Sequence, residues 1–228
     1  MQVRTRHAPS FGVARLLLAP GEPVRISPGS MLATSYGVAI TGRSGGGLLK
    51  SLAGRALGGA QPAPATTCTA GQQGGWVDVA APLPGDLHVV DPGEGQGWCV
   101  ARSAWLASAS TVRCDEQWPG FRALFGGEPG FLDHVSGAGG VVLSCYGALD
   151  AMTLQPGEFV TVAPGHVVAY GDGLQARLRQ VEHGAPQSLR TGEGLVFDFA
   201  GPGQVLVQTR DPRGLAVWLQ EHGTAARS

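Results

Sequence analysis

The sequence predicts an all-β protein of three tandem units in one domain, with one or two short helices, and three observations lead to that expectation. Short apolar runs alternate with polar residues at a period of two, as in Val24 to Ile26 and Val160 to Val162, which is typical of half-buried strands. The 228 residues include 37 glycines and 16 prolines, enough for many tight turns between short strands. Hydrophobic residues make up 43% of the chain and charged residues 14%, a balance that favours a packed core over disorder.

The first strand is expected at the start of the chain, where residues 1–7 alternate in polarity. This start lacks the apolar stretch of a secretory leader, and the chain contains no apolar run of membrane-spanning length. The cysteines Cys68, Cys99, Cys114 and Cys145 show no CxxC spacing, which favours reduced thiols in a cytosol. We therefore expect a cytoplasmic protein, which can still associate with a membrane surface.

The three units are visible as internal similarity. Residues 18–33 match residues 154–169 without a gap, and eight of the 16 positions are identical. A weaker middle copy aligns residues 105–107 with residues 31–33. Since repetition at a fixed period indicates a repeated structural element, we expect a single domain over 1–228. Its units cover about 1–80, 81–145 and 146–210, and a tail follows at 211–228.

Each unit begins with a Pro-Gly pair followed by an acidic residue. Proline presets φ and glycine accepts a positive φ, so the pair suits the centre of a type II turn. The recurrence of the acidic residue indicates turn capping or contact between units rather than a catalytic pair. The predicted structural turn residues are Pro20, Gly21, Glu22, Pro84, Gly85, Asp86, Pro156, Gly157 and Glu158.

A glycine-rich element precedes the last strand of the second and third units, because residues 135–143 match residues 199–207. In the third unit it reads Gly201, Pro202 and Gly203. Glycines at such positions let two backbones approach closely or form a bulge. We therefore add these three residues to the predicted structural turns.

Two segments have helical patterns. Apolar residues between Leu48 and Leu57 form one stripe, and Gly58 ends the segment. A helix of this length is unstable alone in water, so its stripe must pack on its own domain, on a partner or on a membrane interface. A second short helix is expected from Pro212 to His222, ending at Gly223.

Tests for chemistry give no catalytic, cofactor or metal residues. Residues 42–46 match the GxSxG nucleophile pattern, but that hydrolase fold needs a parallel sheet with intervening helices, so a glycine-rich loop is favoured. None of the six histidines forms a metal-binding pair, and His166 reads as a lone turn or core histidine. The net charge is −1 without a basic stripe, so no nucleic-acid partner is expected.

The combined motifs resemble one family over about residues 1–210. Besides the Pro-Gly-acidic turns, the chain contains Pro-Gly-Ser-Met at 28–31, a long glycine-rich segment at 192–203 and Gln-Thr-Arg at 208–210. This combination is similar to the altered inheritance of mitochondria protein 24 family. The resemblance implies a fold like that of the tryptophan RNA-binding attenuation protein, with three short double-stranded β-helix units per chain and trimeric rings. It implies no catalytic residues.

These observations lead to a non-enzymatic scaffold or assembly protein, with itself as partner in a homotrimer. A membrane surface or another protein would be a further partner. The alternative is a small-molecule-binding module with its site between β units. An enzyme is the third choice, because no residue pattern supports one.

Overall fold

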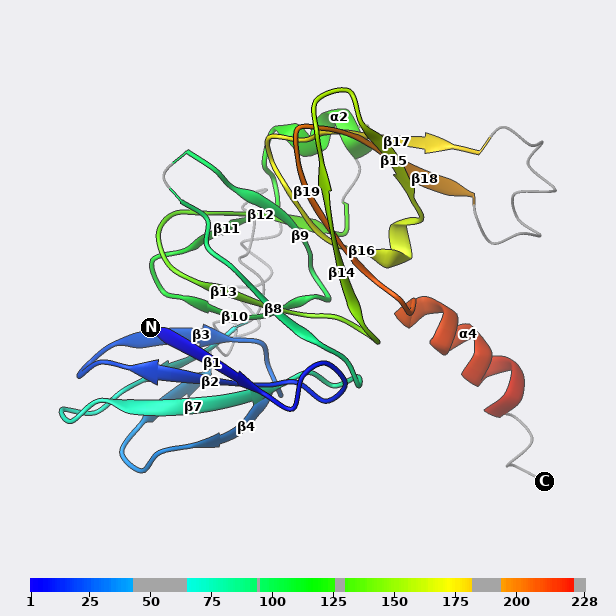
Figure 1. The fold of residues 1–228 in the computed structure, drawn as a ribbon. Coiled ribbons are helices and arrows are strands. Elements are labelled where there is room, and N and C mark those ends of the chain that lie inside the picture. Colours follow the sequence, from blue (N-terminus) through cyan, green and yellow to red (C-terminus); the bar gives the residue numbers. More distant parts are fainter. Residues whose placement is uncertain (43–64, 94, 126–129, 182–193, 224–228) are drawn as a thin grey trace, which may run out of the picture.

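The computed structural model describes residues 1–42, 65–93, 95–125, 130–181 and 194–223, and confirms the all-β class (Figure 1). A first strand, β1 (Gln2–Arg6), lies where the alternation predicts it. The first unit contains β2 (Val13–Leu18), β3 (Pro23–Ile26), β4 (Met31–Thr34), β5 (Ala39–Gly42), β6 (Thr66–Thr69) and β7 (Gly75–Ala80). The second contains β8 (Leu87–Val90), β9 (Trp98–Ala101), β10 (Trp105–Ala109), β11 (Arg113–Asp115), β12 (Leu132–Ser136) and β13 (Val141–Ser144). The third contains β14 (Leu149–Leu154), β15 (Phe159–Val162), β16 (Val167–Gly171), β17 (Gln175–Gln180), β18 (Leu195–Ala200) and β19 (Gly203–Gln208).

All three units pair their strands in the same antiparallel pattern. The first and third strands flank the sixth, as in β2-β7-β4, and the second and fourth flank the fifth, as in β3-β6-β5. Successive units are connected by the second strand of one and the third strand of the next. These connections are β3–β10, which we call the first joint, and β9–β16, the second joint.

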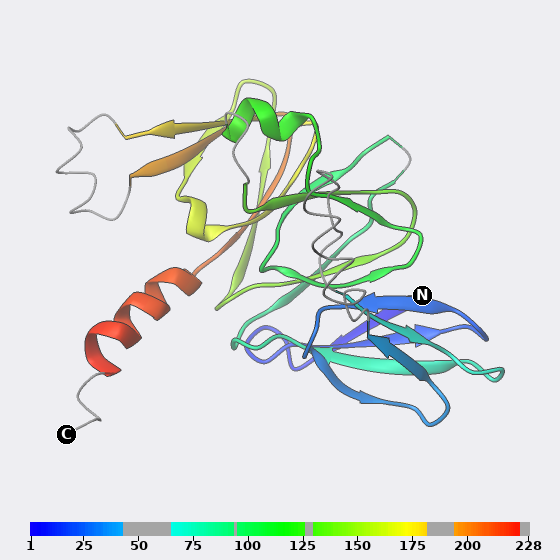
Figure 2. The same cartoon turned by 180° about the vertical axis from the view of Figure 1, so that it is seen from behind.

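The joints build two six-stranded sheets, and a smaller sheet remains at each end. The larger sheets have the orders β5-β6-β3-β10-β13-β8 and β11-β12-β9-β16-β19-β14. The end sheets have the orders β1-β2-β7-β4 and β15-β18-β17. They lie at opposite ends of the molecule in both views (Figures 1 and 2).

A shared irregularity fixes which residues correspond between units. The third strand shifts its register against the sixth between Met31 and Ala33, between Trp105 and Ala107, and between Val167 and Ala169. These are the segments that align in the sequence, so each unit has the same bulge at the same place. Residues at the same place in this pairing pattern are called equivalent below.

Two apolar clusters form the core. One belongs to the first unit and to strands β8, β10 and β13 of the second, with Leu16, Val24 and Val77 at 0% exposure. The larger one runs through the second and third units and includes Phe197 and Phe199, which have no exposed surface. Alternation along the strands produces this arrangement, since every second side chain of β2, from Ala14 to Leu18, is buried.

Three short helices accompany the strands. The predicted C-terminal helix is confirmed as α4 (Pro212–His222), which starts with the Asp211 side chain accepting a hydrogen bond from the Arg213 backbone N–H at 2.8 Å. Helix α2 (Gly120–Phe125) and the 3₁₀ turn η1 (Pro164–His166) were not predicted. The segment expected to be helical between Leu48 and Leu57 lies outside the described residues. Within the described part of the chain, no helix has the length and apolar character needed to cross a membrane.

Candidate functional site

The first and third predicted turns have the same geometry and cap themselves. Gly21 and Gly157 have φ of 70° and 85°, in the region that a type II turn requires. Each following carboxylate accepts a hydrogen bond from the backbone N–H three residues earlier, at 2.8 Å for Glu22 and 2.7 Å for Glu158. The acidic residues therefore close their own turns, in keeping with a structural role.

The middle turn differs from the expected one. Gly85 does not have the positive φ predicted for it, and it is required for a different reason. A Cβ at this position would lie 1.9 Å from the Cys145 carbonyl oxygen, so only glycine allows the two backbones to approach. The Asp86 carboxylate instead accepts a hydrogen bond from the backbone N–H of the next residue, Leu87, at 2.8 Å. The expectation of three identical turns is therefore wrong at this unit.

The glycine-rich element of the third unit allows close backbone contact. A Cβ on Gly201 would meet the Gln155 carbonyl oxygen at 2.4 Å, and one on Gly203 would meet the Leu174 side chain at 2.7 Å. Gly203 has φ of 151° and the peptide bond before Pro202 is cis. These residues shape the entry to β19 and present no group for chemistry.

The other chemical leads do not form a site. Among the described residues, no group of three or more histidine, cysteine or acidic side chains could hold a metal ion. His166 bonds through Nδ1 to the Gln208 carbonyl oxygen at 2.7 Å, as a turn histidine does. Of the GxSxG match at 42–46, all but its first glycine lies outside the described residues.

Sequence reasoning missed one histidine contact. His134 of β12 lies 3.0 Å from the Asp172 carboxylate and stacks on the Trp118 ring at 4.4 Å between centroids. The Asp172 carboxylate also accepts a hydrogen bond from the Gly97 backbone N–H at 2.9 Å. The His134 ring is buried, and the Asp172 carboxylate already accepts a hydrogen bond from the backbone. We therefore interpret this pair as a contact that holds the loop before β9 in place.

The first joint contains a small cavity whose mostly apolar walls carry a few polar groups. It has a volume of about 40 Å³, which is enough for a few water molecules. Its lining comes from both units, and the residues are Arg25, Ala65, Val100, Arg102, Trp105, Cys114, Asp133 and Val135. Among the described residues, the buried polar atoms of this joint without a hydrogen-bond partner are Arg25 Nε, Trp105 Nε1 and Ser108 Oγ. Such atoms are rare because each costs free energy to bury.

The charges of the first joint are unevenly paired. Arg102 Nε donates to Asp133 Oδ1 at 2.9 Å, and Arg102 also lies 3.9 Å from the Glu116 carboxylate. Burial raises the pKa of Asp133, although the Arg102 guanidinium stabilises the charged carboxylate and opposes part of that rise. Arg25 donates to the Val112 carbonyl oxygen, and within the described part of the chain it makes no ion pair. Among the described residues that line the cavity, the guanidinium of Arg25 is therefore a cation without an ion pair.

The second joint is apolar at the equivalent positions. Cys99 replaces Arg25, Val167 replaces Trp105, Phe197 replaces Asp133 and Ala176 replaces Cys114. Here aromatic rings fill the space. Phe197 and Phe199 stack with 5.4 Å between centroids, and Tyr170 lies 5.0 Å from Phe199.

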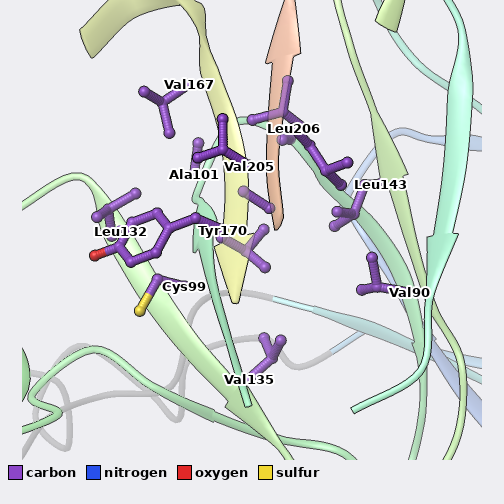
Figure 3. Packing of buried hydrophobic residues seen from close by; sticks show 14 of the residues in the cluster. Val90, Cys99, Ala101, Leu132, Val135, Leu143, Val167, Tyr170, Val205 and Leu206 are labelled. Carbon is purple, nitrogen blue, oxygen red and sulfur yellow. The ribbon is translucent and has the colours of Figure 1, made fainter. Parts of the chain in front are cut away.

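Figure 3 shows Tyr170 of this second joint beside Leu132 and Cys99, with Val167 and Val205 close by. Among the described residues that pair across this joint, the Tyr170 hydroxyl is the unpartnered polar atom, and it carries no charge. The second joint thus closes by packing alone, which the first joint does not.

Each end sheet has two edge strands within the described part of the chain, and β4 and β15 are the ones whose equivalents in the other units are paired on both sides. β4 pairs with β7 on one side, and β15 pairs with β18 on one side. Their equivalents inside the chain, β10 and β9, pair on both sides. An unpaired strand edge exposes backbone groups to another strand.

Comparison with known proteins identifies the family. Residues 3–210 match the family described as mitochondrial biogenesis AIM24. The chain belongs to the AIM24 family. A similar relative, the Streptococcus pyogenes serotype M6 protein M6_Spy0233, is 28% identical over 220 residues, covering 93% of this chain and 87% of the relative. The X-ray structure of SPYM3_0169 from Streptococcus pyogenes has the same fold, with a TM-score of 0.79 and 24% identity over 97% of this chain and 99% of that one.

Membership agrees with the resemblance seen in the sequence and places the all-β fold in a family with a solved bacterial structure. The AIM24 description names a process and no chemical reaction. The function of this member must therefore be argued from its own residues.

Proposed function

We propose that this AIM24-family chain is a non-enzymatic assembly protein, a scaffold whose copies associate head to tail. One observation carries the proposal: the free edges of β4 and β15 are the two halves of a joint that the chain already makes twice. β15 is equivalent to β3 and β9, and β4 is equivalent to β10 and β16. β15 of one copy therefore fits β4 of the next, whereas the two lie at opposite ends of a single chain (Figure 1).

The internal joints also set the register of this contact. Ile26 pairs with Ala107 in the first joint, and Val100 with Ala169 in the second. The equivalent pair between copies is Val162 with Ala33, so Thr161 of one copy would lie opposite Thr34 of the next. Antiparallel pairing in this register would continue the sheet from one chain to another.

Exposure at the free edge supports the same contact. Leu32 of β4 is 58% exposed, whereas its equivalents Leu106 and Val168 are 1% and 0% exposed. On the other edge, Phe159 of β15 is 76% exposed. An apolar side chain that is buried in both internal joints and open at the end of the chain favours a joint completed by a second copy.

A head-to-tail contact closes into a ring when the rotation per copy allows it and otherwise gives a filament. Closure would cover the free edges of β4 and β15 in every copy, which protects these edges against uncontrolled association. We propose a homotrimer, with nine units in the ring, as the family resemblance implies. A membrane surface or a further protein would then meet the assembled scaffold, and the exposed Val217, Trp218 and Leu219 of α4 favour such contact.

Mass measurement with matched variants tests the assembly. Leu32→Asp should convert the oligomer to the 23.4 kDa monomer, because a charge would enter the joint. Leu219→Asp makes the same change at a side chain of similar exposure, 51%, away from either edge, and should leave the mass unchanged. Multi-angle light scattering checks both. A wild-type monomer at micromolar concentration, or equal behaviour of the two variants, would refute the proposal.

Cross-linking tests the register. Cysteines at Thr34 and Thr161 of one chain should join neighbouring copies under mild oxidation, since directly opposed residues reach disulfide distance. Cysteines at Thr34 and Val160 should not, because neighbouring residues on β15 face opposite sides. Non-reducing gels separate the linked chains. Equal cross-linking by both pairs would rule out the register.

A further inference from the structure

We propose that the cavity of the first joint is a binding site for a small monocarboxylate, held by Arg25 and Trp105. This inference is independent of head-to-tail assembly. It rests on three features of the cavity: two unpartnered donors, a cation without an anion, and an apolar alternative that the same fold uses elsewhere.

The donors define the kind of ligand. Arg25 Nε and Trp105 Nε1 both carry hydrogen, neither can accept a hydrogen bond, and both are buried without a partner. Only an acceptor satisfies them. A carboxylate offers two oxygens, each with lone pairs for such donors, and its bonds to a guanidinium are charge-assisted.

The charge defines the sign and the size. Arg102 is already shared by Asp133 and Glu116, whereas Arg25 makes no ion pair within the described part of the chain, so Arg25 is the cation open to a ligand. A monoanion neutralises it, whereas a phosphate dianion would bring excess negative charge close to Asp133. Water can accept the two hydrogen bonds but leaves the half-buried guanidinium of Arg25 without an ion pair. A volume of about 40 Å³ admits a group of a few heavy atoms.

The second joint shows that the fold does not require these polar residues. At equivalent positions it has Cys99, Val167 and Phe197, which fill the space. Polar groups that are poorly satisfied, where an apolar solution exists in the same chain, mark a site kept for binding. The small cavity therefore has a ligand role that its counterpart lacks.

Indole resonances give a direct test on the full chain. Of the five tryptophans, each contributes one ¹⁵N–¹H indole signal, and Trp105→Phe identifies the signal of Trp105. Protein dialysed into chloride buffer is titrated with sodium acetate at constant ionic strength. The Trp105 signal should move saturably, while that of Trp76, in the first end sheet, stays fixed.

Arg25→Gln should weaken acetate binding at least about tenfold, the effect of losing a charge-assisted hydrogen bond. Arg25→Lys keeps the charge but not the Nε donor, so it should restore only part of the affinity. Unchanged signals of the other tryptophans show that each variant is folded. No shift with acetate, an equal shift with chloride, or full binding in Arg25→Gln would each overturn the site.

Discussion

The first and second joints share one backbone design and differ in what fills it. In the second joint, the rings of Phe197 and Phe199 stack on each other, and neither side chain has exposed surface. In the first joint, the equivalent of Phe197 is Asp133, and a cavity with unpartnered donors remains. The strand pairing is the same in both, so pairing alone does not decide how a joint is packed. The side chains that meet across it do.

This difference separates stability from binding within one chain. An apolar joint gains free energy from burial, whereas a polar joint pays for unpaired donors unless a ligand satisfies them. We therefore expect the second joint to hold the chain together and the first to respond to what it binds. The free edges of β4 and β15 add a third joint, which forms only between copies.

The largest expected effect is the loss of an aromatic ring from the second joint. Phe197→Ala should lower the free energy of unfolding by about 3–5 kcal/mol, because it leaves a cavity in a fully buried cluster. Urea denaturation followed by circular dichroism, at one protein concentration, measures the loss.

The matched variant in the first joint is Asp133→Ala, at the equivalent position. It should cost about 1–2 kcal/mol at most, since Asp133 already lies beside a cavity and its partner Arg102 is 41% exposed. Equal losses for the two variants would show that the joints are packed alike, contrary to the comparison.

Much of each unit could be predicted from local sequence. Alternation marked the strands, the Pro-Gly pairs marked two of the three turns, and the proline at the start and the glycine at the end marked α4. The prediction for Gly85 was wrong because a Pro-Gly pair can be required for two reasons. In the outer turns the glycine adopts a positive φ, and in the middle turn it allows two backbones to approach closely.

The joints could not be predicted in the same way. Arg25 and Ser108 are paired across the first joint although they lie far apart in the sequence, and no local pattern announces that pairing. Arg25 alternates in β3 like any outward-facing polar residue, so its place in a cavity with Trp105 and Asp133 appears only when two units meet. The free edges likewise follow from sheet order, not from composition.

A smaller effect is expected from pH, in the same direction in the two joints but of different size. Burial in the second joint raises the pKa of Cys99 from 9.0 to about 12. Above pH 9 the unfolded chain releases this proton and the native chain keeps it. The stability is therefore complete below pH 9 and falls as the pH rises from 9 towards 12.

Cys99→Ala should remove that part of the alkaline loss, so its unfolding free energy should fall less steeply than that of the wild type between pH 8.5 and 10.5. Cys114 of the first joint also has a pKa raised by burial, but the Arg25 charge opposes the rise. Cys114→Ala should therefore flatten the slope less. Urea titrations across this pH range compare the three proteins, and identical slopes would contradict the assignment to Cys99.

The smallest expected effect comes from removing an unpartnered donor of the first joint. Trp105→Phe keeps a large aromatic side chain but deletes the Nε1 hydrogen, which has no partner in the structure. Deleting a buried, unsatisfied donor relieves a desolvation cost that offsets the lost packing, so the free energy of unfolding in chloride buffer should change by less than about 1 kcal/mol. In acetate at a concentration that saturates the wild type, the same change should become clearly destabilising, because the variant keeps Arg25 but lacks the Trp105 donor and so gains less of the stabilisation that ligand binding supplies. Urea denaturation in the chloride and acetate buffers separates the effect of the lost donor on folding from its effect on acetate binding. A loss of several kcal/mol in chloride would mean that Trp105 packs as tightly as the rings of the second joint, and the contrast between the joints would then fail.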